Sequence, residues 1–225
     1  MDIKLCVFDC DGTIVDSQDS IVRSMQAAFA TCGLAVPSPH AIRRVVGLPL
    51  ATAAQILAPD GTDPRLADNL ADAYRDCFRG LRENGEIDDP LFPGVHDTVN
   101  ALDAAGWLLG IATGKGRRGL DQTLERHGLA GRFISLQTAD SAPGKPNPGM
   151  LLNAMADAGA RPGNTVMIGD TTFDVEMSNN AGVLAIGVAW GYHEADELSV
   201  AGARRVIAGF EDLVPSLNEL MEAST

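Results

Sequence analysis

The chain has 225 residues, 45% of them hydrophobic, which is enough for one large domain or for a core domain with a smaller insertion. Its 17 Lys and Arg residues against 30 Asp and Glu residues give a formal net charge of −13, which excludes the overall basic surface of a nucleic-acid or membrane-surface binder. The 4 cysteines form no CxxC pair and have no His at zinc-ligand spacing, so we interpret them as reduced thiols. The first residues lack the apolar region of a signal peptide, and no apolar run reaches membrane-spanning length, so we expect a cytoplasmic protein.

The predicted elements begin with a short apolar strand in "MDIKLCVFD", which is followed at once by a second aspartate and a glycine. After this strand, residues 17–88 predict helices only. A helix over 17–33 has apolar residues at helical spacing and ends at Gly33. "SPHAIRRVV" and "PLATAAQIL" predict two shorter helices, and "DPRLADNLADAYRDCFRGL" predicts a long one.

From Leu91 onward, helices and strands alternate. The helices repeatedly end at a glycine, and an apolar, β-rich run follows. In chain order, we expect helix 95–106, strand 107–113, helix 119–128, strand 133–139, helix 148–159, strand 165–169, helix 174–182, strand 184–190, and a last strand and helix within 204–221. This alternation is typical of an α/β fold with a doubly wound parallel sheet.

The order of the elements also predicts the domain organisation. The first strand fits the same sheet as the later strands, so the all-helical segment is an insertion between them. We therefore predict a Rossmann-like catalytic core formed by residues 1–15 and 90–225, with an inserted all-helical cap domain formed by residues 16–89.

Polar residues follow four of the predicted strands. In a sheet of this kind, ligands bind beyond the carboxyl ends of the strands. The residues at these ends are Asp9, Asp11, Thr113, Gly114, Lys115, Lys145, Asp170 and Asp174. Each alone is a weak signal, because an aspartate after a strand is often part of a turn and a loop lysine is usually solvated. Their coincidence at one end of one sheet predicts a shared site.

These residue types suit phosphoryl chemistry. Crowded carboxylates repel one another unless a cation joins them, and hard oxygen ligands with room for water suit Mg²⁺. A lysine, a threonine hydroxyl and backbone N–H groups at a helix start form a phosphate cradle. A carboxylate in line with the phosphorus can attack it, and a second carboxylate two residues further on, on the same side of an extended chain, can protonate the leaving oxygen.

The same residues resemble the motifs of the haloacid dehalogenase superfamily of phosphohydrolases. "DCDGT" looks like its first motif, DxDGT, and "ATG", ending at Gly114, looks like its second, a strand-end Ser or Thr. Lys145 in "GKPNP" looks like the third motif, and "GDTTFD" looks like the fourth, GDxxxD. The resemblance covers essentially the whole chain, including the helical cap. One small departure is Cys10, where the family usually has a larger apolar residue.

The resemblance implies a catalytic role for each matching residue. Asp9 would be the nucleophile, and Asp11 would be the general acid and base. Thr113 and the Gly114 amide would hold the phosphate. Lys145 would neutralise both Asp9 and the transferring group.

The resemblance also implies a metal site and an activity. The Mg²⁺ ligands would be Asp9, Asp11 through its backbone carbonyl, Asp170, and Asp174 either directly or through water. The activity would be hydrolysis of a small soluble phosphate monoester through an aspartyl-phosphate. The opening DxDGTxVDS is similar to that of phosphoglycolate phosphatases, so 2-phosphoglycolate is a candidate substrate.

One alternative from another class is a dinucleotide-binding oxidoreductase. "GKGRRG", residues 114–119, formally matches GxGxxG after a strand, and Asp140 follows at about the 20-residue spacing of that fingerprint. This hypothesis leaves Asp9 and Lys145 without a role, and a single match of this kind is weak. A receiver-type signalling domain also uses acids, a Thr and a Lys on such a sheet, but its phosphorylated aspartate follows a later strand and it has no helical insertion.

Within the family, three alternatives to a phosphatase are weaker. A dehalogenase should lack an acid at the position of Asp11. A phosphonatase needs a lysine in its cap, and none of the 3 lysines, Lys4, Lys115 and Lys145, lies between residues 17 and 88. A sugar phosphomutase shares the cap type but tends to have a bulkier residue at the position of Thr13, and it stays open as an alternative.

The cap is expected to close over the site, with hinges near residues 14–17 and 88–93. Two of its arginines, Arg43 and Arg44, are candidate contacts to a second anionic group of the substrate. We expect the partner to be a small phosphorylated metabolite, with no nucleic acid and no membrane. Sugar phosphates, nucleotide monophosphates and pyrophosphate stay open beside 2-phosphoglycolate.

Overall fold

A computed structural model describes residues 3–59 and 63–223 of the chain. Its sheet has six parallel strands in the order β3-β2-β1-β4-β5-β6. The strands are β1 (Lys4–Phe8), β2 (Trp107–Ala112), β3 (Ser135–Gln137), β4 (Thr165–Gly169), β5 (Leu184–Val188) and β6 (Arg205–Ile207). The strand order reverses between β1 and β4, and doubly wound sheets bind their ligands at such a reversal. The predicted α/β class with a parallel sheet is confirmed.

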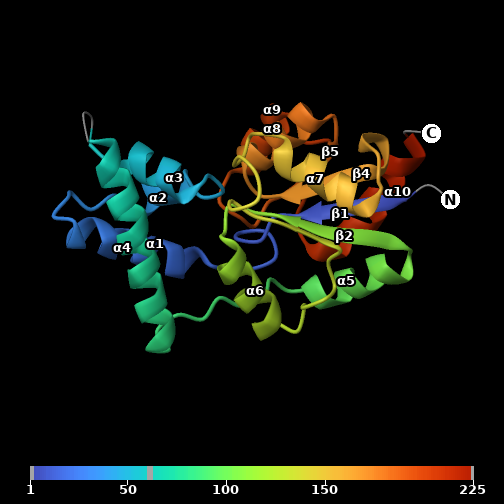
Figure 1. The fold of residues 1–225 in the computed structure, drawn as a ribbon. Helices are drawn as coiled ribbons and strands as arrows, with labels where there is room; N and C mark the ends of the chain where they lie inside the picture. The colour runs from blue at the N-terminus through green and yellow to red at the C-terminus, as the bar shows by residue number, and fades with distance from the viewer. Residues whose placement is uncertain (1–2, 60–62, 224–225) are drawn as a thin grey trace.

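The helices form two groups, which Figure 1 shows on opposite sides of the view. The first group, inserted after β1, lies to one side of the sheet: α1 (Gln18–Thr31), α2 (Pro39–Arg43), α3 (Leu50–Leu57) and α4 (Pro64–Glu83). The second group covers the sheet: α5 (Val95–Ala104), α6 (Arg117–Arg126), α7 (Gly149–Ala158), α8 (Thr172–Ala181), α9 (Ala195–Ala201) and α10 (Leu213–Ala223). Two 3₁₀ helices, η1 (Pro162–Asn164) and η2 (Phe210–Asp212), complete the described elements. The predicted all-helical insertion is therefore confirmed.

Strand β1 lies at the centre of the sheet and is buried on both faces. Leu5 and Val7 pack in a core with side chains of α7 and α8, whereas Cys6 and Phe8 pack in a second core with side chains of α5, α6 and α10. Successive residues of a strand point to opposite faces, so a strand between two helical layers is apolar throughout. Cys10 continues the second core, which agrees with an apolar role for this residue.

The inserted helices have a core of their own. In α1, apolar side chains recur one turn apart at Ile21, Met25 and Phe29, and they pack in this core with Ile42 and Leu70. This packing holds α1 and α4 together, because each helix alone has only one apolar face to bury.

The chain enters and leaves the inserted helices at one place. Val15 bridges to Leu91, the N–H of Asp16 donates to the carbonyl of Pro90 (2.8 Å), and the N–H of Phe92 donates to the carbonyl of Ile14 (3.1 Å). The two connecting segments therefore run side by side. We propose that they form the boundary between a core of residues 1–15 and 90–225 and a cap of residues 16–89, and that closure hinges there.

One helix was not predicted from the sequence. Helix α9 follows Glu194, whose side chain exchanges capping hydrogen bonds with the first turn around Glu197, and it ends at Gly202. Glutamate is not among the usual capping residues, and Leu198 is the buried side chain of this short helix. A helix with so little apolar surface leaves almost no periodic signal in the sequence.

Truncating Leu70 tests the core of the inserted helices. Because Leu70 is fully buried, the Leu70→Ala variant should lower the free energy of unfolding by about 2–5 kcal/mol, measured by urea denaturation. The control is Ile56→Ala on α3, whose side chain is 58% exposed and whose loss should change this free energy by less than about 0.5 kcal/mol. Equal effects of the two variants would contradict the packing described here.

Candidate active site

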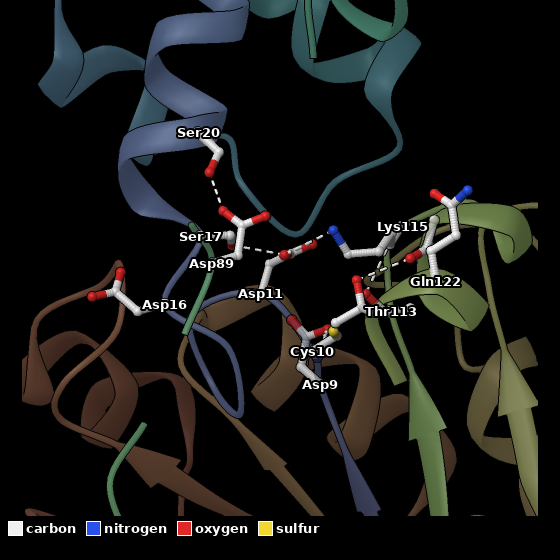
Figure 2. Close-up of polar contacts among 12 residues, drawn as sticks. Asp9, Cys10, Asp11, Asp16, Ser17, Ser20, Asp89, Thr113, Lys115 and Gln122 are labelled. Carbon is white, nitrogen blue, oxygen red and sulfur yellow. Dashed lines mark hydrogen bonds and ion pairs between the residues drawn. The ribbon is translucent and has the colours of Figure 1, made fainter. Parts of the chain in front are cut away.

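The carboxyl ends of the central strands bring the predicted site residues together. Asp9 directly follows β1, Thr113 follows β2, and Asp170 follows β4. Lys145 lies in the loop between β3 and α7. A cavity of about 640 Å³ between this edge of the sheet and the inserted helices is lined by both Asp9 and Thr113. Asp11, Gly114 and Lys115 line the same cavity. Figure 2 shows Asp9, Asp11, Thr113 and Lys115 close together beyond the ends of these strands.

Lys145 lies between two buried carboxylates. Its ammonium nitrogen is 2.7 Å from Asp9 Oδ2 and 2.7 Å from Asp174 Oδ1, and the lysine side chain is 0% exposed. Burial lowers the pKa of Lys145, but the Asp174 and Asp9 carboxylates raise it by more, so the pKa lies above its ordinary value and the side chain stays charged. A buried charge of this kind is tolerated only because it is paired.

Three carboxylates crowd around this lysine. Oxygen atoms of Asp9, Asp170 and Asp174 all lie within 4.8 Å of one another, and all three residues are buried. Burial raises the pKa of Asp9 to about 7, although Lys145 lowers it. Burial, followed by the charges of Asp9 and Asp174, raises the pKa of Asp170 well above its ordinary value. One ammonium cannot neutralise three carboxylates, so this set of hard oxygen donors fits a small divalent cation.

Asp170 is held in position by groups from two other segments. Thr13 Oγ1 donates to Asp170 Oδ1 (2.7 Å), and the N–H of Tyr192 donates to Asp170 Oδ2 (2.9 Å). Gly12 has a φ of +84°, and a Cβ on it would lie 2.3 Å from Asp170 Oδ2. The glycine after Asp11 is therefore required both by its left-handed backbone and by the close approach of this carboxylate.

The two carboxylate oxygens of Asp174 have different partners. Oδ2 accepts hydrogen bonds from the N–H (3.1 Å) and the hydroxyl (2.7 Å) of Thr171, which caps the start of α8. Oδ1 faces Lys145. The capping role expected of an acid in a first helical turn is therefore present, and it orients the carboxylate toward the site.

Asp11 has a separate set of partners at the mouth of the cluster. Its Oδ1 lies 3.0 Å from Lys115 Nζ and accepts a hydrogen bond from Ser17 Oγ (2.7 Å), as Figure 2 shows. Ser17 Oγ in turn lies 3.3 Å from the hydroxyl of Tyr192. Lys115 was predicted at this edge of the sheet, whereas the contact of Ser17 with Tyr192 was not, because Tyr192 lies far away in the sequence.

The segment after β2 lies against a loop of the inserted helices. Thr113 Oγ1 accepts a hydrogen bond from the N–H of Lys115 (3.2 Å). A Cβ on Gly114 would lie 2.9 Å from the carbonyl oxygen of Gly47 and 3.1 Å from that of Leu48. A side chain at residue 114 would therefore push the α2–α3 loop away from the site.

Two other sequence signals have structural explanations. Asp140, the candidate ribose ligand of a dinucleotide site, accepts a hydrogen bond from the N–H of Arg117 (2.7 Å) and so caps the start of α6. Arg44 forms an ion pair with Glu197 of α9 (2.6 Å). Neither Arg43 nor Arg44 lines the cavity in the part of the chain that the structure describes.

Residues 6–188 match the family model of haloacid dehalogenase-like hydrolases. The chain belongs to this family. This haloacid dehalogenase-like hydrolase is 36% identical over 225 residues to the "Probable phosphatase IndB" of Dickeya dadantii, covering 98% of this chain and 96% of that protein. It is 30% identical over 208 residues to a phosphoglycolate phosphatase of Vibrio vulnificus, covering 89% of this chain and 90% of that protein.

Solved structures agree with this assignment. A crystal structure of a predicted phosphatase from Clostridium acetobutylicum is similar with a TM-score of 0.85 and 26% identity, covering 97% of this chain and 100% of that chain. The structure of a hydrolase from Pseudomonas syringae has a TM-score of 0.85 and 25% identity, covering 96% of this chain and 98% of that chain. The predicted family and its hydrolase class are therefore confirmed.

Among the described helices, none combines the length and apolar character needed to cross a membrane.

Removing the buried ammonium tests the charge balance of the cluster. Lys145→Met leaves Asp9 and Asp174 buried without their cation, so in metal-free buffer it should lower the free energy of unfolding by about 3–5 kcal/mol. The matched control is Lys4→Met, an exposed lysine on β1 whose loss should cost less than about 1 kcal/mol. Both are measured by urea denaturation in EDTA, and a Lys145→Met variant as stable as the control would refute the ion pairs.

Proposed function

We propose that the chain is a Mg²⁺-dependent phosphatase that hydrolyses a small soluble phosphate monoester through an aspartyl-phosphate on Asp9. The observation that carries this proposal is the burial of Asp9 beside Lys145 and two further carboxylates at the base of the cavity. An aspartate used only for structure would not need an ammonium and two more acids around it. The relatives named as phosphatases support the same activity.

The carboxylates of Asp9, Asp170 and Asp174, together with the backbone carbonyl of Asp11, are the proposed Mg²⁺ ligands. When bound, the ion supplies positive charge that offsets the repulsion between these carboxylates and the phosphate of the substrate. Thr13 and the N–H of Tyr192 fix the orientation of Asp170 from behind, as outer groups commonly do at metal sites.

Asp9 performs the first step. One of its oxygens attacks the phosphorus, and the bond between phosphorus and the ester oxygen breaks. Asp11 gives its proton to the departing oxygen, which leaves as the alcohol. Thr113 and the Gly114 amide bind the phosphate oxygens, while the charge of Lys145 stabilises the negative charge that develops around the transferring group.

Asp11 also acts in the second step. Now deprotonated, it accepts a proton from a water molecule as the water oxygen attacks the phosphorus of the aspartyl-phosphate. The bond between Asp9 and phosphorus breaks, and inorganic phosphate is released with Asp9 regenerated. Lys115 and Ser17 hold the Asp11 carboxylate at the cavity mouth, where it can serve both steps.

On similarity alone, 2-phosphoglycolate is a candidate substrate, because several relatives that cover 89–98% of the chain are named phosphoglycolate phosphatases. A sugar phosphomutase is the weaker alternative, because such enzymes tend to have a bulkier residue at the position of Thr13. A phosphomutase must also keep water away from its aspartyl-phosphate, so it would not release phosphate. Release of inorganic phosphate distinguishes the two activities.

Replacing the nucleophile tests the proposal directly. Asp9→Asn keeps the shape of the side chain but removes its nucleophilic charge, so kcat for phosphate release should fall by at least about 10³-fold while the circular dichroism spectrum is unchanged. Asp16→Asn is the matched control, because Asp16 is exposed and lies on the same segment. Figure 2 shows its carboxylate apart from those of Asp9 and Asp11. Appreciable activity in Asp9→Asn would assign the nucleophile elsewhere.

Metal removal tests the cofactor. Treatment with EDTA should stop the hydrolysis of an aryl phosphate, and excess Mg²⁺ should restore it, because the clustered carboxylates of Asp9, Asp170 and Asp174 repel an incoming phosphate when no cation is bound. The measurement is phosphate release before and after addition of the metal. Activity that is indifferent to the chelator would contradict the proposed metal site.

A further inference from the structure

The cavity has two chemically different halves. The half beneath the inserted helices contains Asp9, Asp11, Thr113 and Gly114, which are the groups proposed to bind and transfer phosphate. The half above it is formed mainly by apolar side chains of α1, α2, the α2–α3 loop and α4: Ile21, Met25, Ile42, Val45, Tyr74 and Phe78. A substrate that fills the cavity therefore places its phosphate against polar groups and its alcohol against apolar ones.

An aromatic pair on α4 lies next to the proposed general acid. The rings of Tyr74 and Phe78 stand one helical turn apart, with centroids 5.9 Å from each other and planes inclined by 33°. Lys115 Nζ is 5.7 Å from the centroid of the Phe78 ring and 3.0 Å from Asp11 Oδ1. Because Asp11 protonates the leaving oxygen, the group attached to that oxygen lies beside this aromatic pair.

The arginines on the wall of α4 already have acidic partners. The ion pairs are Arg75 with Asp72 (2.6 Å), Arg79 with Asp76 (3.2 Å) and Arg82 with Asp89 (3.4 Å). The side chains of Arg75 and Arg79 are 57% and 56% exposed, so they belong to the solvated rim. Arg118 lines the opposite, core side and is also exposed.

This distribution of charge does not suit a second anionic group close to the phosphate. A carboxylate on the leaving alcohol, as in 2-phosphoglycolate, would lie near the aromatic pair of Tyr74 and Phe78. It would lose its hydration against these and the neighbouring apolar side chains. A neutral apolar group in the same place loses no hydration and buries apolar surface.

We propose, on the basis of the phosphatase function above, that the substrate is the phosphate monoester of an alcohol bearing a neutral apolar or aromatic group, which packs on Tyr74 and Phe78. The chemical steps are unchanged: the phosphorus–oxygen bond of the ester breaks, and the alcohol leaves with the proton from Asp11. The aromatic pair selects the alcohol, because the apolar group of the alcohol is buried against the two rings when the cap closes.

Three primary alkyl phosphates test this substrate class in the wild-type enzyme with Mg²⁺: 2-phenylethyl phosphate, ethyl phosphate and 2-phosphoglycolate. All three are esters of primary alcohols, so their leaving groups differ little in chemical reactivity. Differences in kcat/KM therefore report contacts between the alcohol and the cavity. Burial of the phenyl group should make kcat/KM for 2-phenylethyl phosphate at least about tenfold higher than for each of the other two, equivalent to about 1.4 kcal/mol.

The variant Phe78→Ala connects the preference to the aromatic pair. It should reduce the ratio of kcat/KM for 2-phenylethyl phosphate to that for ethyl phosphate by at least about fivefold. A ratio measured on one preparation is insensitive to any fraction of unfolded protein. The control Ile56→Ala changes an exposed side chain of α3 outside the cavity and should keep the wild-type ratio.

The possible outcomes separate this inference from the function on which it rests. If 2-phosphoglycolate or ethyl phosphate is hydrolysed as efficiently as 2-phenylethyl phosphate, the inference is overturned and the phosphatase function stands. The same holds if Phe78→Ala keeps the wild-type ratio. If none of the three esters, nor a generic aryl phosphate, releases phosphate in the presence of Mg²⁺, both the function and the inference are overturned.

Discussion

The buried ammonium of Lys145 is the interaction on which the rest of the site depends. It lies 2.7 Å from a carboxylate oxygen of Asp9 and 2.7 Å from one of Asp174, with no exposed side-chain surface. Without it, two acids would be buried side by side, and they would have to take up protons or move apart. With it, the acids can stay close enough together to hold a divalent cation.

The fold keeps these charges in place with groups that do no chemistry themselves. The capping interaction at the start of α8 orients Asp174, and Thr13 with the backbone of Tyr192 orients Asp170. The parallel sheet brings these segments to one edge, because β1 lies between β2 and β4. Rigid elements, together with hydrogen bonds from residues behind the site, let an enzyme keep several carboxylates close together despite their repulsion.

The inserted helices supply the other half of the cavity with different chemistry. Their wall is apolar and aromatic around Tyr74 and Phe78, while the α2–α3 loop lies against Gly114 at the site. Tyr192 joins the two parts, since its backbone holds Asp170 while its ring packs in the core of the inserted helices. Tyr192 therefore connects the core of the inserted helices with the acidic cluster.

The sequence by itself determined the parallel α/β core, the helical insertion and the positions of Asp9, Asp11, Thr113, Lys145, Asp170 and Asp174, because strand ends in a doubly wound sheet meet at one edge. It did not reveal the short helix α9, which has little apolar periodicity, nor the partners that orient the site. The position of the Phe78 ring beside Lys115 depends on how α4 packs, and α4 belongs to a segment distant from Lys115 in the chain. Such contacts arise from side-chain packing between segments distant in sequence, for which no local spacing exists, so only the tertiary structure decided them.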